Sequence, residues 1–135
     1  MTINGRADQD GLAFSREIKL DPDPASVRKA RDFVRTNLRE LGFPASVDNG
    51  VLIASELVTN AVREAPDTPC LVAVRVGAGH PVIEVHDGSP ELPEMRSPDF
   101  VAERGRGLHI VDALSDDWDC VQSGGGKAVI VILPC

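Results

Sequence analysis

The chain has 135 residues, a length typical of one domain. Its 42% hydrophobic and 26% charged residues are ordinary for a globular protein, and its formal net charge is −7. This charge disfavours direct binding to nucleic acid, which requires a basic face, and it equally disfavours binding to anionic membranes. It does not exclude a nucleotide, because a nucleotide site depends on local amides, a few cations and Mg²⁺.

The cysteine pattern bears on the compartment. Cys70, Cys120 and Cys135 are an odd number of cysteines without C-x-x-C spacing, and the three histidines show no ligand spacing with them. We therefore expect reduced thiols and no zinc site. Because the chain also lacks a signal segment and an 18-residue apolar run, we expect a cytoplasmic protein.

The first part of the chain predicts a tail, a strand and a helix. Residues 1–11 are polar and are expected to form a flexible tail before a single domain of residues 12–135. Residues 12–20 alternate loosely between apolar and polar, which predicts an edge strand. An Asp-Pro pair at 23–24 then opens an amphipathic helix, which Gly42 ends.

The rest of the chain predicts a second long helix and two hairpins. The expected elements are a helix at about 45–65, strands at 71–76 and 82–85, a long loop at 88–104, a helix at 107–114, and strands at 117–121 and 128–133. This order mixes helices with hairpins. It predicts an α+β fold, a two-layer sandwich with a mixed, mostly antiparallel sheet and helices packed on one face.

Glu56 and Asn60 are the first polar pair of interest. They are four residues apart on a largely apolar predicted helix, so both side chains lie on one face. A buried carboxylate and amide need partners, which a bound Mg²⁺ and a water would supply. Taken alone, however, the pair favours the plainer interpretation of a solvent-facing helix edge. Glu64, four residues further on, is expected to face solvent beside Arg63.

Asp87-Gly88 ends the second strand of the first predicted hairpin and is followed by Ser89-Pro90. An Asp-Gly turn is frequent and has no functional meaning by itself. Its interest lies in the segments that accompany it.

Arg104-Gly105-Arg106-Gly107-Leu108 precedes the predicted third helix. Glycines before a helix expose amide N–H groups that can hold phosphate at the helix N-terminus, and two arginines add positive charge in an acidic chain. The plainer interpretation is a glycine hinge with surface arginines. We favour the phosphate interpretation.

These three segments, in this order, resemble the N, G1 and G2 boxes of the GHKL (Bergerat-fold) ATPases. The form Asp87-Gly88-Ser89-Pro90 is similar to a subgroup found in actinobacteria, the anti-sigma-factor serine/threonine kinases of the RsbW and SpoIIAB type. The resemblance covers residues 14–134. It implies the Bergerat ATP-binding fold, with ATP and Mg²⁺ as cofactors.

The resemblance also implies roles for single residues. Glu56 is the expected general base, and Asn60 the expected Mg²⁺ ligand. Asp87 and Gly88 would contact adenine, and residues 91–104 would form the ATP lid. The phosphates would be held by the third segment, and Lys127 is a further expected cofactor-binding residue. The phosphate-binding residues implied are Arg104, Gly105, Arg106, Gly107 and Leu108.

One position near the C-terminus departs from the family pattern. Relatives have a Thr after the Gly-Lys pair that helps to read adenine, and this chain has Ala128 after Gly126-Lys127. That leaves adenine recognition to Asp87 and water.

Two functional hypotheses follow. The first is an ATP-binding regulatory kinase that sequesters a sigma factor and phosphorylates a serine on a STAS-domain antagonist, and the resemblance implies that it is a homodimer. The second is a non-catalytic protein-binding module with a degenerate nucleotide site. The acidic composition suits a basic protein partner such as a sigma-factor domain. Whether the chain is an enzyme stays open at this point. The G1 box reads Asp87-Gly88-Ser89-Pro90 where the usual pattern of the superfamily is Asp-x-Gly-x-Gly, and this reduced box and Ala128 favour the second hypothesis.

Overall fold

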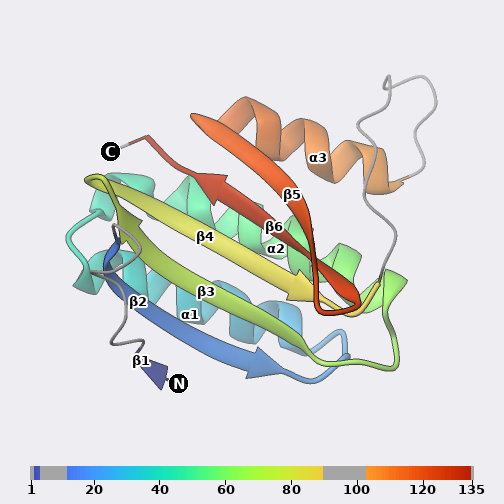
Figure 1. Cartoon of the computed structure of the whole chain (residues 1–135). Helices are drawn as coiled ribbons and strands as arrows, with labels where there is room; N and C mark the ends of the chain where they lie inside the picture. Colours follow the sequence, from blue (N-terminus) through green and yellow to red (C-terminus); the bar gives the residue numbers. More distant parts are fainter. Residues whose placement is uncertain (1, 4–11, 90–102, 135) are drawn as a thin grey trace.

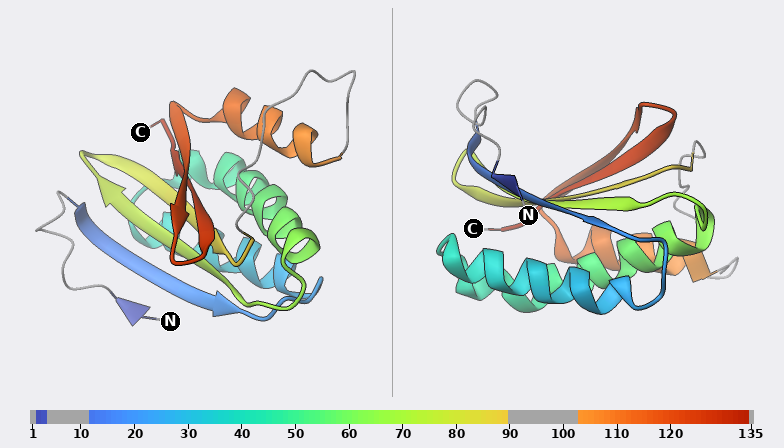
Figure 2. Two further views of the ribbon diagram at one scale, coloured as in Figure 1. Left: turned by 45° about the vertical axis from the view of Figure 1, so that its right-hand side comes forward. Right: turned by 90° about the horizontal axis from the view of Figure 1, so that it is seen from below.

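The computed structural model describes residues 2–3, 12–89 and 103–134. It is an α+β structure of two layers, with one antiparallel sheet covered on one face by helices, as the sequence predicts (Figures 1 and 2). The strands are β1 (Thr2–Ile3), β2 (Leu12–Leu20), β3 (Cys70–Gly77), β4 (His80–Asp87), β5 (Asp117–Ser123) and β6 (Gly126–Ile132). The helices are α1 (Ser26–Glu40), the 3₁₀ turn η2 (Pro44–Ser46), α2 (Val47–Glu64) and α3 (Glu103–Leu114).

The sheet order is β1-β2-β3-β4-β6-β5, and every neighbouring pair is antiparallel. The short strand β1 pairs with β2 through Thr2 and Ile3, so β2 is not the edge strand that its pattern predicted. Residues 4–11, the rest of the expected tail, lie outside the described part of the chain.

Helix α1 begins two residues later than the Asp-Pro signal predicts. Asp23 caps the turn that precedes it, with its Oδ1 accepting a hydrogen bond from the Ala25 N–H at 2.9 Å. The C-terminus matches the prediction, because Gly42 has a φ of 92° in the left-handed region. The Phe43 N–H donates to the Leu38 carbonyl at 2.8 Å, which completes a Schellman motif.

Helix α2 packs closely against both α1 and the sheet. A Cβ at Gly50 would lie 2.5 Å from Leu38 Cδ1 and 3.2 Å from Ile83 Cδ1, so only glycine lets the helix approach this far. The core between the layers is formed by one face of each central strand and the apolar stripes of α1 and α2. Its largest members include Val34, Leu38, Ile53, Val58, Val72, Val74, Ile83, Val85, Val131 and Leu133.

Both hairpins turn on two residues with positive φ, the geometry that matches the twist of paired strands. Ala78 and Gly79 have φ of 52° and 81°, and Gly124 and Gly125 have φ of 54° and 86°. Strand β6 therefore begins at Gly126, two residues before the predicted start. This brings Lys127 into the sheet as the register partner of Asp87.

Helix α3 begins at Glu103, four residues before the predicted start at Gly107. It lies on the helical side of the sheet, next to α2 (Figure 2). In the described part of the chain, no helix is long and apolar enough to cross a membrane.

Candidate nucleotide-binding site

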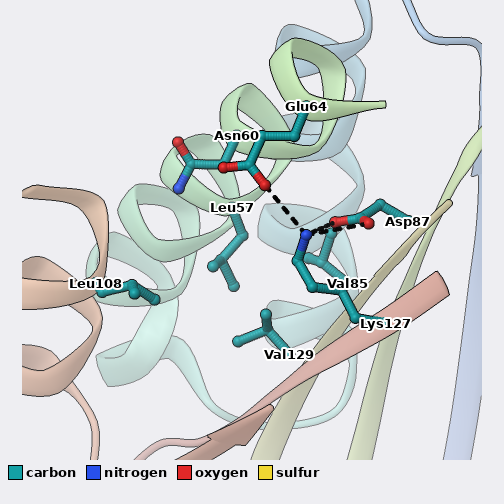
Figure 3. Close-up of a pocket in the computed structure, with 8 residues that line it drawn as sticks. All are labelled: Leu57, Asn60, Glu64, Val85, Asp87, Leu108, Lys127 and Val129. Atoms are coloured by element: carbon teal, nitrogen blue, oxygen red, sulfur yellow. Dashed lines mark hydrogen bonds and ion pairs between the residues drawn. The ribbon is translucent and has the colours of Figure 1, made fainter. Parts of the chain in front are cut away.

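Residues from four elements line one small cavity between the two layers (Figure 3). Asn60 comes from α2, Asp87 from the end of β4, Lys127 from β6 and Leu108 from α3. The remaining lining residues are Leu57, Glu64, Val85 and Val129. Asn60, Asp87, Leu108 and Lys127 were all predicted from the sequence as cofactor-binding residues, and the fold brings these four to the same place.

Lys127 and Asp87 form an ion pair inside this cavity. The Lys127 Nζ lies 3.1 Å from Asp87 Oδ2 and 3.3 Å from Oδ1, so the ammonium faces both carboxylate oxygens. Both side chains project from neighbouring strands toward the helices (Figure 3). Lys127 is only 4% exposed. A lysine this deeply buried needs compensating negative charge, which Asp87 supplies in part.

Glu64 supplies the second negative charge. Its Oε2 lies 3.2 Å from the Lys127 Nζ, and its side chain is 12% exposed. The expectation that Glu64 faces solvent was wrong. The last turn of α2 lies over the ends of β4 and β6, so its glutamate reaches the cavity. The triad of Lys127, Asp87 and Glu64 has one positive and two negative formal charges.

Asp87 is further held by the backbone that follows it. The Ser89 N–H donates to Asp87 Oδ1 at 2.8 Å, which closes an Asx turn at the end of β4. A Cβ at Gly88 would collide with the side chain of Thr68, so the chain needs glycine here for close packing. This local geometry fixes the direction of the carboxylate before any ligand arrives.

Asn60 lies on the cavity side of α2, one turn before Glu64 (Figure 3). Within the described part of the chain, the Asn60 amide makes no hydrogen bond. Its oxygen is therefore available to a ligand. Glu56 lies one turn earlier on the same helix, half-buried, and is not among the lining residues. The assigned roles of Asn60 as metal ligand and Glu56 as general base stay predictions.

The arginine- and glycine-rich segment belongs to the first turns of α3, not to a loop before it. Arg104, Gly105, Arg106 and Gly107 have helical backbone, and their side chains lie outside the description. The predicted start of α3 was wrong because the two glycines were taken to precede the helix, whereas they lie within its first turns. Leu108 is buried and lines the cavity. The expected lid, residues 91–104, falls mostly within residues 90–102, which the structure does not describe.

Most of the chain matches a known family of domains. The model of the family "histidine kinase-like ATPase domain" matches residues 20–133. The chain belongs to this family of ATPase domains. The search of curated proteins gave no match. The resemblance to GHKL ATPases is thus confirmed at the level of the superfamily, and ATP is the ligand that membership implies.

In this histidine kinase-like ATPase domain, the side chains that line the cavity suit ATP and Mg²⁺, but the cavity is too small to hold a nucleotide base. Asp87 is an acceptor for an exocyclic amine, and Asn60 offers an amide oxygen to Mg²⁺. Yet the cavity measures about 20 Å³, which holds roughly one water molecule. The side chain of Lys127 takes up the space in front of Asp87.

Ala128 does not lie in this ATPase site. It is the register partner of His86 on β4, one position from the Asp87 and Lys127 pair, so it faces the other side of the sheet. His86 Nε2 pairs there with Glu84 at 3.0 Å, on the face away from Asp87. The residue beside the adenine-type aspartate is therefore Lys127. The departure from the family pattern that was noted at Ala128 therefore concerns a residue on the opposite face of the sheet from the site.

A wider, open hollow of about 420 Å³ lies at the same end of the sheet, beyond Asp87. It is lined by Lys19, Thr68, Pro69, Cys70, Leu71, His86, Asp87, Gly88, Gly124, Gly125 and Gly126. Among the residues that the structure describes, none from α2 or α3 lines this hollow, and Asp87 and Gly88 are the box residues that reach it. We therefore assign the nucleotide site to the smaller cavity, where the predicted residues meet.

The cysteines near the site are protonated thiols at neutral pH. Burial, together with the Asp87 charge, raises the pKa of Cys70 to about 11, and burial also raises the pKa of Cys120. A thiol with a raised pKa is a poor nucleophile and metal ligand. Within the described residues, no group of three or more His, Cys, Asp or Glu is placed to hold a metal ion.

Proposed function

We propose that this ATP-binding domain is a regulatory serine/threonine kinase of the anti-sigma-factor type. It would sequester a sigma factor and phosphorylate a STAS-domain antagonist. The observation that supports the proposal most is the meeting of Asn60 and Asp87 at one cavity, with α3 beside it, in a chain that the ATPase family matches over residues 20–133. Asn60 lies in the N box, Asp87 in the G1 box, and α3 begins with the G2 box.

Each side chain has a distinct part in the proposed reaction. Asp87 accepts a hydrogen bond from the base, and Asn60 provides an oxygen ligand for Mg²⁺. Glu56 accepts the proton of the substrate serine hydroxyl. ATP supplies the phosphoryl group. Because phosphoryl transfer depends mostly on positioning and charge stabilisation, a site with so few groups is sufficient.

The phosphates are assigned to the first turn of α3. Its leading amide N–H groups have no partner within the helix, and the positive end of the helix dipole lies there. Arg104 and Arg106 belong to this turn and add positive charge. Gly105 and Gly107 carry no side chain that would block a close approach by the phosphates.

The partners are proposed from charge. The chain has a net charge of −7, which complements a basic domain such as that of a sigma factor and favours a protein partner over nucleic acid. A homodimer is part of the same proposal, since the regulatory kinases of this type act as dimers.

A second function is favoured by one observation. Lys127 fills the space in front of Asp87 and is held there by two carboxylates. A domain whose base pocket stays closed would be a protein-binding module with a degenerate nucleotide site. Partner binding would then be independent of ATP.

Phosphoryl transfer to purified STAS-domain proteins from the same organism, with labelled Mg-ATP, separates the two functions. A kinase transfers label to a serine. The Glu56→Gln variant should lose transfer while it keeps nucleotide and partner binding, and Asp48→Asn, an exposed acid on the same helix, should behave like the wild type. Partner binding without transfer in the wild type would support the binding module.

A further inference from the structure

Lys127 occupies the position that an adenine amine would need. Its ammonium lies 3.1 and 3.3 Å from the two oxygens of Asp87, so it covers the front of the carboxylate. An exocyclic amine is also a donor and would approach the same oxygens. A lysine ammonium and a base amine are both donors only, so they compete for one acceptor.

The space around the lysine strengthens this competition. The cavity of about 20 Å³ accepts about one water molecule, and a purine is many times larger. Leu108 of α3 forms one apolar wall, and the other three, Leu57, Val85 and Val129, belong to α2 and the central strands of the sheet. Those three walls are part of the core and cannot retreat without unpacking it. Lys127, by contrast, has a long flexible side chain that can leave the lining.

Lysine suits such a movement. Its ammonium is a point charge on a flexible four-carbon stem, so the head can leave the cavity by rotation of side-chain bonds while β6 stays paired with β4. What holds it in place is the pair of carboxylates. Glu64, at 3.2 Å, comes from α2 and not from the sheet, so it fixes the lysine from the opposite layer.

We propose that Lys127 controls access of the base to the nucleotide site, and that Glu64 is the residue that positions it there. The inference rests on the proposed ATP-binding function. In the nucleotide-free protein the lysine closes the pocket by its contacts with Asp87 and Glu64. ATP enters only when the lysine leaves, so part of the binding free energy is used to break these contacts and the apparent affinity is reduced.

Calorimetric titrations with three probes test this inference. ATP has both base and phosphates, adenosine has only the base, and inorganic tripolyphosphate has only the phosphates. Lys127→Met keeps an apolar stem without charge, and should bind ATP and adenosine about tenfold more tightly than the wild type, the factor expected for removal of one charged hydrogen bond. Its binding of tripolyphosphate should not tighten.

Glu64→Gln is the second variant, since it loosens the lysine while both other members of the triad remain. It should also tighten adenosine binding, by a smaller factor than Lys127→Met does. This variant still tests the inference if Lys127→Met does not fold. Asp48→Asn is the matched control. Because Asp48 is an exposed acid at the far end of α2, this variant should bind all three probes like the wild type.

Other outcomes would overturn the inference in distinguishable ways. Weaker adenosine binding by Lys127→Met would mean that the lysine contacts the base, and unchanged binding would mean that it only stabilises the fold. Either result leaves the proposed function intact. If the wild type and all folded variants bind neither ATP nor adenosine, both the inference and the proposed function fail.

Discussion

Lys127 and Asp87 face one another across two neighbouring strands, and the lysine ammonium lies 3.1 Å from the aspartate carboxylate. The aspartate that the sequence assigns to adenine is therefore already paired with a residue of the same chain. Glu64 on α2 completes the arrangement and links the helical layer to the sheet. The candidate site is thus also a structural contact between the two layers, and the two roles can be separated by mutation.

The structural role predicts a strong coupling between Lys127 and Glu64. Lys127→Met removes the ammonium that lies between two poorly exposed carboxylates, and we expect a loss of about 3–5 kcal/mol in the free energy of unfolding at pH 7. In the double variant with Glu64→Gln, the loss should be smaller than the sum of the single losses, because the Glu64 charge that Lys127 no longer balances is also removed. Urea denaturation of the four proteins measures this cycle. Additive losses would show that the triad does not act as a unit.

The proposed metal role of Asn60 predicts a magnesium-dependent effect. Asn60→Ala should weaken ATP binding about tenfold or more when Mg²⁺ is present and much less when it is absent, because the variant lacks the amide oxygen assigned to the metal. Calorimetry with and without Mg²⁺ measures both affinities. Asn49→Ala, an exposed asparagine in the first turn of the same helix, is the control. Equal weakening in both conditions would argue against a metal ligand at this position.

The start of β6 predicts a steric requirement beside the site. A Cβ at Gly126 would collide with the backbone carbonyl oxygen of Asp87, and backbone atoms cannot yield as a flexible side chain can. Gly126→Ala should therefore cost about 1–3 kcal/mol of stability or more and weaken ATP binding at the same time. In the adjacent turn, the Cβ of Gly125→Asn would meet no atom within 4 Å, and asparagine tolerates positive φ better than most residues, so this variant should cost less stability than Gly126→Ala. Equal stability of the two variants would contradict the close approach.

The raised pKa of Cys70 predicts a loss of stability in alkali. The thiol has a pKa of about 11 when folded and 9.0 as its reference value, so between these pH values the unfolded chain binds fewer protons than the folded one. Stability is then present below about pH 9 and is lost as the pH rises toward 11, by roughly 2–3 kcal/mol from this group. Denaturation curves at several pH values should show a shallower decline for Cys70→Ala. A slope identical to that of the wild type would contradict the assignment.

The sequence predicted the parts of the site that depend on local pattern. The Glu56 and Asn60 spacing requires only a helix, and Asp87 requires only a strand that ends in a turn. Two glycine-containing turns were sufficient to place the β3–β4 and β5–β6 hairpins. These are short-range signals, and α2, β4 and both hairpins were found where they were expected.

The parts that failed depend on long-range geometry. Glu64 and Lys127 are 63 residues apart, and no periodicity predicts that they meet. The turn at Gly124 and Gly125 starts β6 at Gly126, so Lys127 and not Ala128 faces the site, a difference of one position that reverses the face. For α3, glycines in the first turns hid a helix start that the backbone nevertheless adopts at Glu103.

The most direct test of the account is the calorimetric titration of the wild-type protein with ATP, in the presence and absence of Mg²⁺. We predict measurable binding of ATP that strengthens with Mg²⁺. Its affinity should be reduced because ATP must break the contacts of Lys127 with Asp87 and Glu64. The absence of heat of binding at millimolar ATP, in both the wild type and Lys127→Met, would contradict a nucleotide site at this cavity. The function of the fold would then be to bind a protein partner.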